Sequence, residues 1–251
     1  MYYPRQPTIR MRATPPRPLI FMPAYNAAGH LPGVVRRIPA EVWEAVDGLV
    51  VVDDGSADAT ADAVKALMAE FPKIELVRHA ANRGYGGAQK TGYRRALELG
   101  AGAVVMLHSD GQYPPELLPA MLAPLADGYD VVGGSRSKYG GMREGGMSLA
   151  RYWGTILLTA LENLVFRQHL TIYHSGYRAY SRAALERIPF ERYSDTFNFD
   201  SEMLVGAFRA RLAIAEVPIP TIHGAGYSSL APIPYGLSVL RTLARYLLGR
   251  I

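Results

Sequence analysis

Short apolar runs alternate with helix-length segments along the first 135 or so residues of this 251-residue chain. The runs cover residues 19–22, 49–52, 74–77, 103–107 and 129–134, and helices are expected between them. Strands that alternate with helices in this way form parallel sheets, because each helix crosses over one face of the sheet before the next strand begins. The sequence therefore predicts an α/β fold with a mainly parallel central sheet flanked by helices.

The composition limits the classes of protein that fit. With 49% hydrophobic residues the chain can bury the core of one large domain, and with no cysteine it has neither disulfides nor thiolate metal sites. A net charge of +5 admits a polyanionic partner, but nucleic acid is not expected because no aromatic and basic platform is present. The longest apolar run, residues 156–161, is too short to span a bilayer, and no signal peptide is recognisable. We expect a cytoplasmic protein, either soluble or resting peripherally on the inner face of the membrane.

Polar and glycine residues follow four of the predicted strands, at 23–26, 53–56, 82–87 and 108–112. The carboxyl ends of parallel strands meet at one edge of the sheet, where α/β proteins bind their ligands. Neither GxGxxG nor GxxxxGK[ST] is present, which argues against a dinucleotide oxidoreductase and a P-loop NTPase. Carboxylates at strand ends instead suit a nucleotide whose diphosphate carries Mg²⁺ or Mn²⁺, since both ions prefer oxygen ligands.

Six segments in order carry a family resemblance: Pro23-Ala24-Tyr25-Asn26, Asp53-Asp54-Gly55-Ser56, Asn82-Arg83-Gly84, Ser109-Asp110-Gly111-Gln112, Gly134-Ser135-Arg136 and Ser175-Gly176-Tyr177-Arg178. Together they resemble the signature of the family 2 inverting glycosyltransferases, which have the Rossmann-like GT-A fold. The closest likeness is to the dolichyl- and polyprenyl-phosphate mannose or glucose synthases. The resemblance covers residues 19–229.

The resemblance implies roles for individual residues. Those implied to bind the nucleotide-sugar donor are Pro23, Ala24, Tyr25, Asn26, Asp53, Asp54, Gly55, Asn82, Gly84, Tyr85, Ser109, Gln112 and Arg136. Asp53 would contact the base or ribose, and Asp110 would hold the divalent cation on the donor diphosphate. Arg136 and Arg178 would offset the charge of that diphosphate or of a phosphate acceptor, since a guanidinium binds phosphate bidentately. On the acceptor side the resemblance points to His174, Ser175, His223 and Ser228.

The chain departs from the family at His108, where the family usually has an acidic residue. Imidazole binds Mn²⁺ but suits Mg²⁺ poorly. His108 is therefore expected as a metal ligand beside Asp110, as a hydrogen-bond donor behind it, or without any contact to the metal. The need for a metal is open for the same reason.

Two carboxylates, Asp200 and Glu202, stand at the start of a predicted helix. Either could take the proton from an acceptor hydroxyl, and placement at the positive end of the helix dipole explains them equally well. A polyprenyl phosphate acceptor is already anionic, so it needs no strong base and depends more on the arginines. Asp110, Asp200, Glu202 and Arg178 are thus the catalytic candidates.

The implied activity is transfer of a hexose from a nucleotide sugar, of the GDP-mannose or UDP-glucose type, to a polyprenyl or dolichyl phosphate at a membrane surface. Transfer to a saccharide, lipid or small-molecule hydroxyl is an alternative, as is a non-catalytic nucleotide-sugar-binding subunit. We expect residues 1–18 to be a flexible basic tail, 19–135 the donor-binding half, 136–230 the acceptor-binding half and 231–251 an amphipathic C-terminal helix. The oligomeric state is left open.

Overall fold

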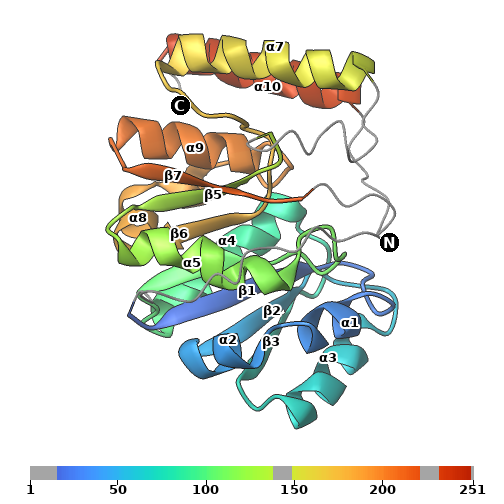
Figure 1. Ribbon diagram of the computed structural model, residues 1–251. Helices are drawn as coiled ribbons and strands as arrows, with labels where there is room; N and C mark the ends of the chain where they lie inside the picture. The colour runs from blue at the N-terminus through green and yellow to red at the C-terminus, as the bar shows by residue number, and fades with distance from the viewer. Residues whose placement is uncertain (1–15, 138–148, 221–231, 250–251) are drawn as a thin grey trace.

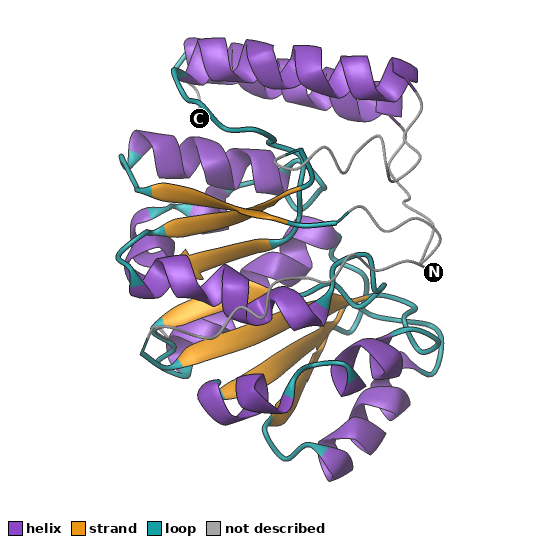
Figure 2. Cartoon of the chain, viewed as in Figure 1, coloured by secondary structure: helices purple, strands orange, loops and turns teal. Residues whose placement is uncertain are grey.

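The computed structural model describes residues 16–137, 149–220 and 232–249. Within these residues a seven-stranded sheet is covered by helices on both faces (Figures 1 and 2). The strands are β1 (Pro18–Ala24), β2 (Gly48–Asp53), β3 (Ile74–Arg78), β4 (Ala103–Met106), β5 (Val131–Ser135), β6 (Arg178–Ser181) and β7 (Ile214–Pro218). The helices are α1 (Leu31–Arg36), α2 (Ala40–Ala45), α3 (Thr60–Glu70), α4 (Tyr85–Glu98), α5 (Leu118–Ala126), α7 (Leu149–Phe166), α8 (Arg182–Arg187), α9 (Phe199–Arg209) and α10 (Pro232–Leu247), with short 3₁₀ turns at Pro115–Leu117 and Phe190–Arg192. The predicted mixed α/β domain is confirmed.

The strand order is β3-β2-β1-β4-β6-β5-β7, and every pairing except those of β6 is parallel. The register aligns Ala24 with Asp53 and Asp53 with Arg78, so the chain leaves neighbouring strands at one level. The sequence pattern did not reveal that β6 runs antiparallel between β4 and β5. After β5 the chain forms α7 and re-enters the sheet at the edge where β5 ends, so β6 runs back along β5.

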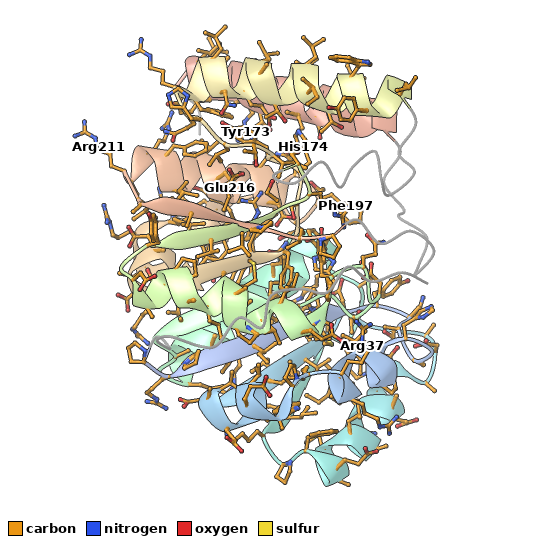
Figure 3. All side chains as sticks on the ribbon, viewed as in Figure 1. Arg37, Tyr173, His174, Phe197, Arg211 and Glu216 are labelled. Atoms are coloured by element: carbon orange, nitrogen blue, oxygen red, sulfur yellow. The ribbon has the colours of Figure 1, made fainter. Side chains whose placement is uncertain are left out.

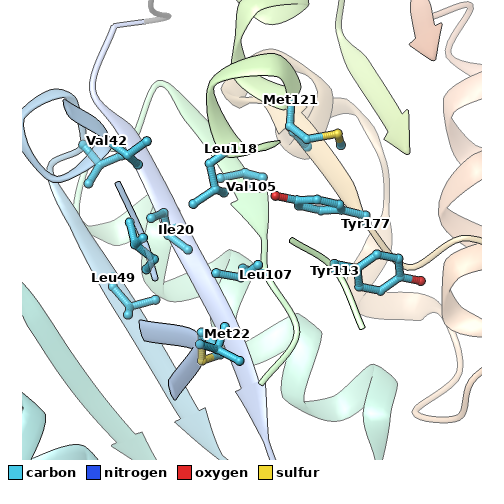
Figure 4. Packing of buried hydrophobic residues seen from close by; sticks show 14 of the residues in the cluster. Ile20, Met22, Val42, Leu49, Val105, Leu107, Tyr113, Leu118, Met121 and Tyr177 are labelled. Carbon is cyan, nitrogen blue, oxygen red and sulfur yellow. The ribbon is translucent and has the colours of Figure 1, made fainter. Parts of the chain in front are cut away.

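The core explains why the central strands read as continuous apolar runs. A sheet with helices on both faces buries the side chains of both faces. Ile20 of β1 and Val105 of β4 pack toward Leu118 and Met121 of α5, with Tyr177 closing the same cluster (Figure 4). All five side chains are fully buried, which fixes the sheet as a rigid base for the loops at its edge.

A separate helical layer lies above α9, where α7 and α10 run side by side (Figure 1). Polar contacts attach α10 to α9: Arg245 pairs with Glu202 at 3.1 Å, and the Thr242 hydroxyl donates to Asn198 at 2.9 Å. The layer exposes large apolar side chains, namely Trp153, Ile156, Leu157, Leu161 and Leu164 on α7 and Leu237, Leu240 and Leu247 on α10. Among the described helices, none is long and apolar enough to cross a membrane.

Candidate functional site

A cavity of about 610 Å³ opens where the carboxyl ends of the parallel strands meet. The loops after β1, β2, β3, β4 and β5 contribute to its wall, together with the start of α4, the segment 174–176 and the start of α9. It brings together most of the residues that the sequence singled out: Pro23, Ala24, Tyr25, Asp54, Asn82, Gly84, Tyr85, His108, Ser109, Asp110, Gln112, Arg136, His174, Ser175 and Asp200.

Asp54 organises one side of this cavity. Its carboxylate accepts hydrogen bonds from the backbone N–H groups of Arg83 (2.9 Å) and Gly84 (3.0 Å), and lies 2.6 Å from Nδ1 of His79. The other ring nitrogen of His79 lies 2.9 Å from the Thr91 hydroxyl of α4. Gly84 has φ of +86°, and a Cβ there would lie 2.5 Å from the Asp195 carbonyl oxygen, so only glycine fits this turn. The ends of β2 and β3 are thereby tied to the start of α4.

Three donor-site predictions lie beside the cavity rather than on its wall. Asp53 is fully buried, accepts the Ser56 N–H at 2.9 Å and pairs with Arg78 at 3.1 Å. Asn26 accepts the Ala57 N–H at 3.0 Å, and Gly55 forms the positive-φ turn between these strand ends. Asp53 therefore stabilises the turn after β2, whereas its neighbour Asp54 lines the cavity. The two side chains differ because consecutive residues at a strand end point to opposite sides.

The stretch after β4 crosses the floor of the cavity. The Asp110 carboxylate accepts the Gln112 N–H at 2.9 Å, and Ser109 donates its hydroxyl to the Pro23 carbonyl at 2.9 Å. Tyr113 accepts the Gly176 N–H at 2.9 Å through its hydroxyl, and its ring meets that of His108 edge-on, with the centroids 4.8 Å apart.

His108 also contacts Tyr85, whose hydroxyl lies 3.2 Å from Nε2. That hydroxyl donates to Asp200 at 3.0 Å, so Nε2 of His108 must supply the proton of the first contact. Burial lowers the pKa of His108 and raises that of Tyr85 well above its ordinary value, so both groups are neutral near pH 7. A Cβ at Gly176 would lie 2.6 Å from the same Nε2, which explains the glycine at this close approach.

Asp200 is the one carboxylate of the predicted pair that faces the cavity. Its two oxygens accept from Tyr85 (3.0 Å) and from the Gln89 side chain (2.9 Å). Glu202 does not reach the cavity: it is buried against the Ser194 N–H (2.7 Å) and Arg245 (3.1 Å). Residues two apart on a helix point in nearly opposite directions, so Glu202 anchors α10 while Asp200 lines the site.

The two predicted arginines also separate. Arg136 lines the cavity with its guanidinium over the Tyr113 ring, 4.9 Å from the centroid. Its Nε and Nη2 atoms are buried and have no hydrogen-bond partner among the described residues, and the same holds for the Ser175 hydroxyl. Arg178 lies behind the wall, almost fully buried, and donates to the backbone carbonyls of Ser175 (3.0 Å) and Tyr173 (2.5 Å). It therefore supports the segment that carries His174 and does not line the cavity itself.

The predicted metal ligands fit a divalent cation only in part. Asp110 offers carboxylate oxygen to the cavity, which is the donor that Mg²⁺ and Mn²⁺ prefer. His108 uses Nε2 toward Tyr85. In the described part of the chain, no cluster of three or more His, Cys, Asp or Glu residues could hold a metal. An ion at Asp110 would take its remaining ligands from the substrate and from water. The acceptor-side candidates His223 and Ser228 lie outside the described residues.

Comparison with known families decides the identity. Residues 19–189 match the model of glycosyl transferase family 2. The chain belongs to this family.

Relatives of this family 2 glycosyltransferase act on lipid phosphates, as their names state. One is the UDP-N-acetylglucosamine–dolichyl-phosphate N-acetylglucosaminyltransferase of Methanococcus voltae, 31% identical over 81% of this chain and 85% of its own length. Another is the undecaprenyl-phosphate mannosyltransferase of Micrococcus luteus, 32% identical over 82% of this chain and 84% of its own. Glucosyl-3-phosphoglycerate synthase from Mycobacterium tuberculosis has the same fold, with a TM-score of 0.64, 24% identity and coverage of 93% and 79% of the two chains.

Sequence reasoning assigned no role to several residues that shape the site of this glycosyltransferase. Phe197 stacks on Tyr85, with the ring centroids 4.9 Å apart, and both line the cavity. Tyr113 supports Arg136, and His79 holds Asp54 from behind. Each of these contacts joins segments far apart in the chain, so no local sequence pattern predicts it. The position of Tyr113, directly after Asp110-Gly111-Gln112, was the only available signal.

Proposed function

We propose that this glycosyltransferase moves a hexose from a nucleotide sugar to a polyprenyl phosphate, with inversion at the anomeric carbon. Both relatives described above carry a lipid phosphate in their names. The sugars in those names differ, so the donor is proposed only as a nucleotide hexose of the GDP-mannose or UDP-glucose type.

The observation that carries the choice of acceptor is the contrast between Asp200 and Arg136. A hydroxyl acceptor needs a base, but both oxygens of Asp200 already accept hydrogen bonds, one from Tyr85 and one from Gln89. Arg136 lines the same cavity, and its buried Nε and Nη2 have no partner among the described residues. Two aligned N–H groups of a guanidinium match two phosphate oxygens. A phosphate acceptor would give the N–H groups of Arg136 a partner, and it would not need Asp200 to act as a base.

The reaction then needs one displacement. A phosphate oxygen of the acceptor attacks the anomeric carbon on the face opposite the nucleoside diphosphate, and the bond from that carbon to the diphosphate oxygen breaks. The electron pair leaves with the diphosphate, and no proton has to move. The residues of the cavity act by positioning both substrates and by offsetting their negative charges.

A divalent cation fits this scheme through Asp110 and the donor diphosphate together. When bound, it would supply positive charge at the leaving group. The Mycobacterium tuberculosis synthase has been crystallised with Mn²⁺ and uridine diphosphate. We propose Mg²⁺ or Mn²⁺ here, held by Asp110 without His108.

The α7–α10 layer is the proposed contact with the membrane that contains the acceptor. Trp153, Leu157 and Leu164 are each more than 60% exposed, and Leu237 and Leu240 of α10 are exposed beside them. Exposed Arg241 adds positive charge on the same helix. Apolar side chains flanked by arginine are typical of helices that lie in the headgroup region of an anionic bilayer.

The first experiment compares two acceptors that differ only in the phosphate. Purified protein is incubated with UDP-glucose, UDP-N-acetylglucosamine or GDP-mannose and with either a polyprenyl phosphate or the matching polyprenol, with Mg²⁺, Mn²⁺ or chelator. We expect glycosylated polyprenyl phosphate from one donor and none from the alcohol. Preferential transfer to the alcohol, or to a soluble saccharide, would overturn the proposal.

Vesicle flotation tests the membrane contact. Wild type should float with vesicles that contain anionic lipid, and a variant with Trp153, Leu157 and Leu164 changed to Ser should not. Met68→Ser with Tyr129→Ser is the matched control, because these two side chains are also exposed and apolar but lie elsewhere. Equal flotation of both variants would show that the α7–α10 layer is not the contact. A wild type that forms dimers through this layer would contradict the proposal as well.

A further inference from the structure

A buried ion pair adjoins the cavity at the base of the α7–α10 layer. It joins His174, which lines the cavity, to Glu162 of α7, with Nε2 and Oε2 3.0 Å apart. Figure 3 shows His174 and Tyr173 directly beneath the α7–α10 layer. No sequence pattern pointed to Glu162, which lies 12 residues before His174 on the apolar helix.

The segment that carries His174 is held from three directions. Arg178 of β6 donates to the carbonyls of Tyr173 and Ser175, on either side of His174. Glu216 of β7 accepts the Thr171 N–H at 3.0 Å, and the Tyr173 hydroxyl donates to Asn163 of α7 at 2.8 Å. The imidazole is therefore presented to the cavity at a defined place.

The pair turns its histidine toward the cavity. The Glu162 side chain is 2% exposed, whereas that of His174 is 13% exposed. Burial raises the pKa of Glu162, and the contact with His174 and the charge of Arg178 oppose that shift. A buried carboxylate needs a hydrogen-bond donor or a cation beside it, and the His174 ring is the group that lies against Glu162.

We propose that His174 is a second cationic ligand of the acceptor phosphate, beside Arg136, and that Glu162 is the positioning residue that supports it. This inference rests on the proposed function, because it names the phosphate subsite of the same cavity. Donor-side residues come from the ends of β1, β2 and β3, whereas His174 and Arg136 come from the later half of the chain. The subsite therefore lies on the side of the cavity that faces α7.

The location suits a lipid substrate. Leu157, Leu161 and Leu164 point outward from α7, and Glu162 points inward from the same helix. A lipid that rests against the outer face of this helix is thus close to the charged group on its inner face. The same helix would provide both the apolar contact and the support for the phosphate ligand.

Steady-state kinetics of the full chain test the assignment, with polyprenyl phosphate and the nucleotide sugar varied in turn. His174→Gln and Glu162→Gln should each raise the KM for polyprenyl phosphate about tenfold, as expected for one charged hydrogen bond, and leave the KM for the donor unchanged. His174→Lys keeps a cation beside Glu162 and should restore most of the lost affinity. Glu191→Gln removes an exposed partner of Arg94 far from the cavity and should behave as wild type.

Thermal unfolding of each variant separates a binding role from a structural one. A folded Glu162→Gln or His174→Gln variant with the wild-type KM for polyprenyl phosphate would overturn the inference. So would an equal rise in the KM values of both substrates, or a His174→Lys variant no better than His174→Gln. If wild type itself transfers nothing to polyprenyl phosphate, the proposed function is wrong, and the proposed phosphate subsite is wrong for the same reason.

Discussion

The proposed donor and acceptor sides of the cavity differ in how their polar groups are satisfied. On the donor side, Asp54 receives hydrogen bonds from two backbone N–H groups and a contact from His79. On the acceptor side, Nε and Nη2 of Arg136 and the Ser175 hydroxyl have no partner among the described residues. On the proposed donor side the polar groups of Asp54 are satisfied within the chain, whereas the proposed acceptor side contains polar atoms that a ligand would satisfy.

This difference has an energetic meaning. A buried polar group without a partner costs about 1–3 kcal/mol, which an anionic ligand recovers when it binds. The donor loops can therefore be stable before any substrate arrives. Changes on the donor side should reduce the stability of the protein, and changes on the acceptor side should mainly reduce function.

Asp110 lies where the two sides meet, so its replacement should have the largest effect. We expect Asp110→Asn to lower kcat about 100- to 1,000-fold, because the amide removes a negative ligand where charge develops in the reaction. Activity measured with Mg²⁺ or Mn²⁺ checks this, with exposed Asp127→Asn as the control. An unchanged kcat would show that Asp110 neither holds the cation nor takes part in the reaction.

Arg136 tests the acceptor side alone. Arg136→Ala should raise the KM for polyprenyl phosphate about ten- to hundredfold, and Arg136→Lys should recover only part, because an ammonium cannot bind phosphate through a bidentate fork. The free energy of unfolding should stay unchanged or rise, since a buried group without a partner is removed. Strong destabilisation of the alanine variant would show that Arg136 also holds the fold together.

Asp54 tests the donor side by the opposite measurement. Asp54→Ala should lower the free energy of unfolding by about 2–3 kcal/mol, because it leaves the N–H groups of Arg83 and Gly84 unpaired. Urea denaturation measures the loss, and His79→Ala should show a smaller one. A variant that keeps full stability but loses donor binding would show that Asp54 contacts the donor and is not needed to hold the loop.

Glu162 should produce the smallest effect, in the pH dependence of stability. Burial raises its pKa above the ordinary 4.5, so the folded chain holds this proton where the unfolded chain has lost it. The resulting stabilisation is present below pH 4.5 and is lost as pH rises through the raised pKa. Glu162→Gln removes that loss, so the Tm of the variant should equal or exceed that of wild type at pH 7, by about 2 °C. A lower Tm at pH 7 would show that the pair with His174 is mainly structural.

Much of this architecture is predictable because it depends on local sequence. Apolar runs with intervening helices gave the sheet, and polar residues after strands gave most of the cavity wall. The choice between adjacent or nearby acids is harder: the pairs Asp53–Asp54 and Asp200–Glu202 each contribute only one member to the wall. Helix geometry could have excluded a joint role for Asp200 and Glu202, but not decided which of them faces the ligand.

Contacts between distant segments are what the sequence could not provide. The Glu162–His174 and His79–Asp54 contacts depend on how α7 and β3 pack against other elements. Arg178 looked like a ligand for phosphate because of its neighbours in sequence, yet it is directed behind the wall by its position on β6. Side-chain direction on a strand follows from register, which is fixed only when the partner strands are known.

The placement of β6 has a consequence for biosynthesis. Because β6 separates β4 from β5, those two strands cannot complete their pairing until residues 178–181 have left the ribosome. A sheet formed before then can contain only β3-β2-β1-β4 on this side of β6 and would have an open edge at β4. An unpaired edge invites pairing with other chains, so the interval between synthesis of β4 and of β6 is when this protein most needs protection from aggregation.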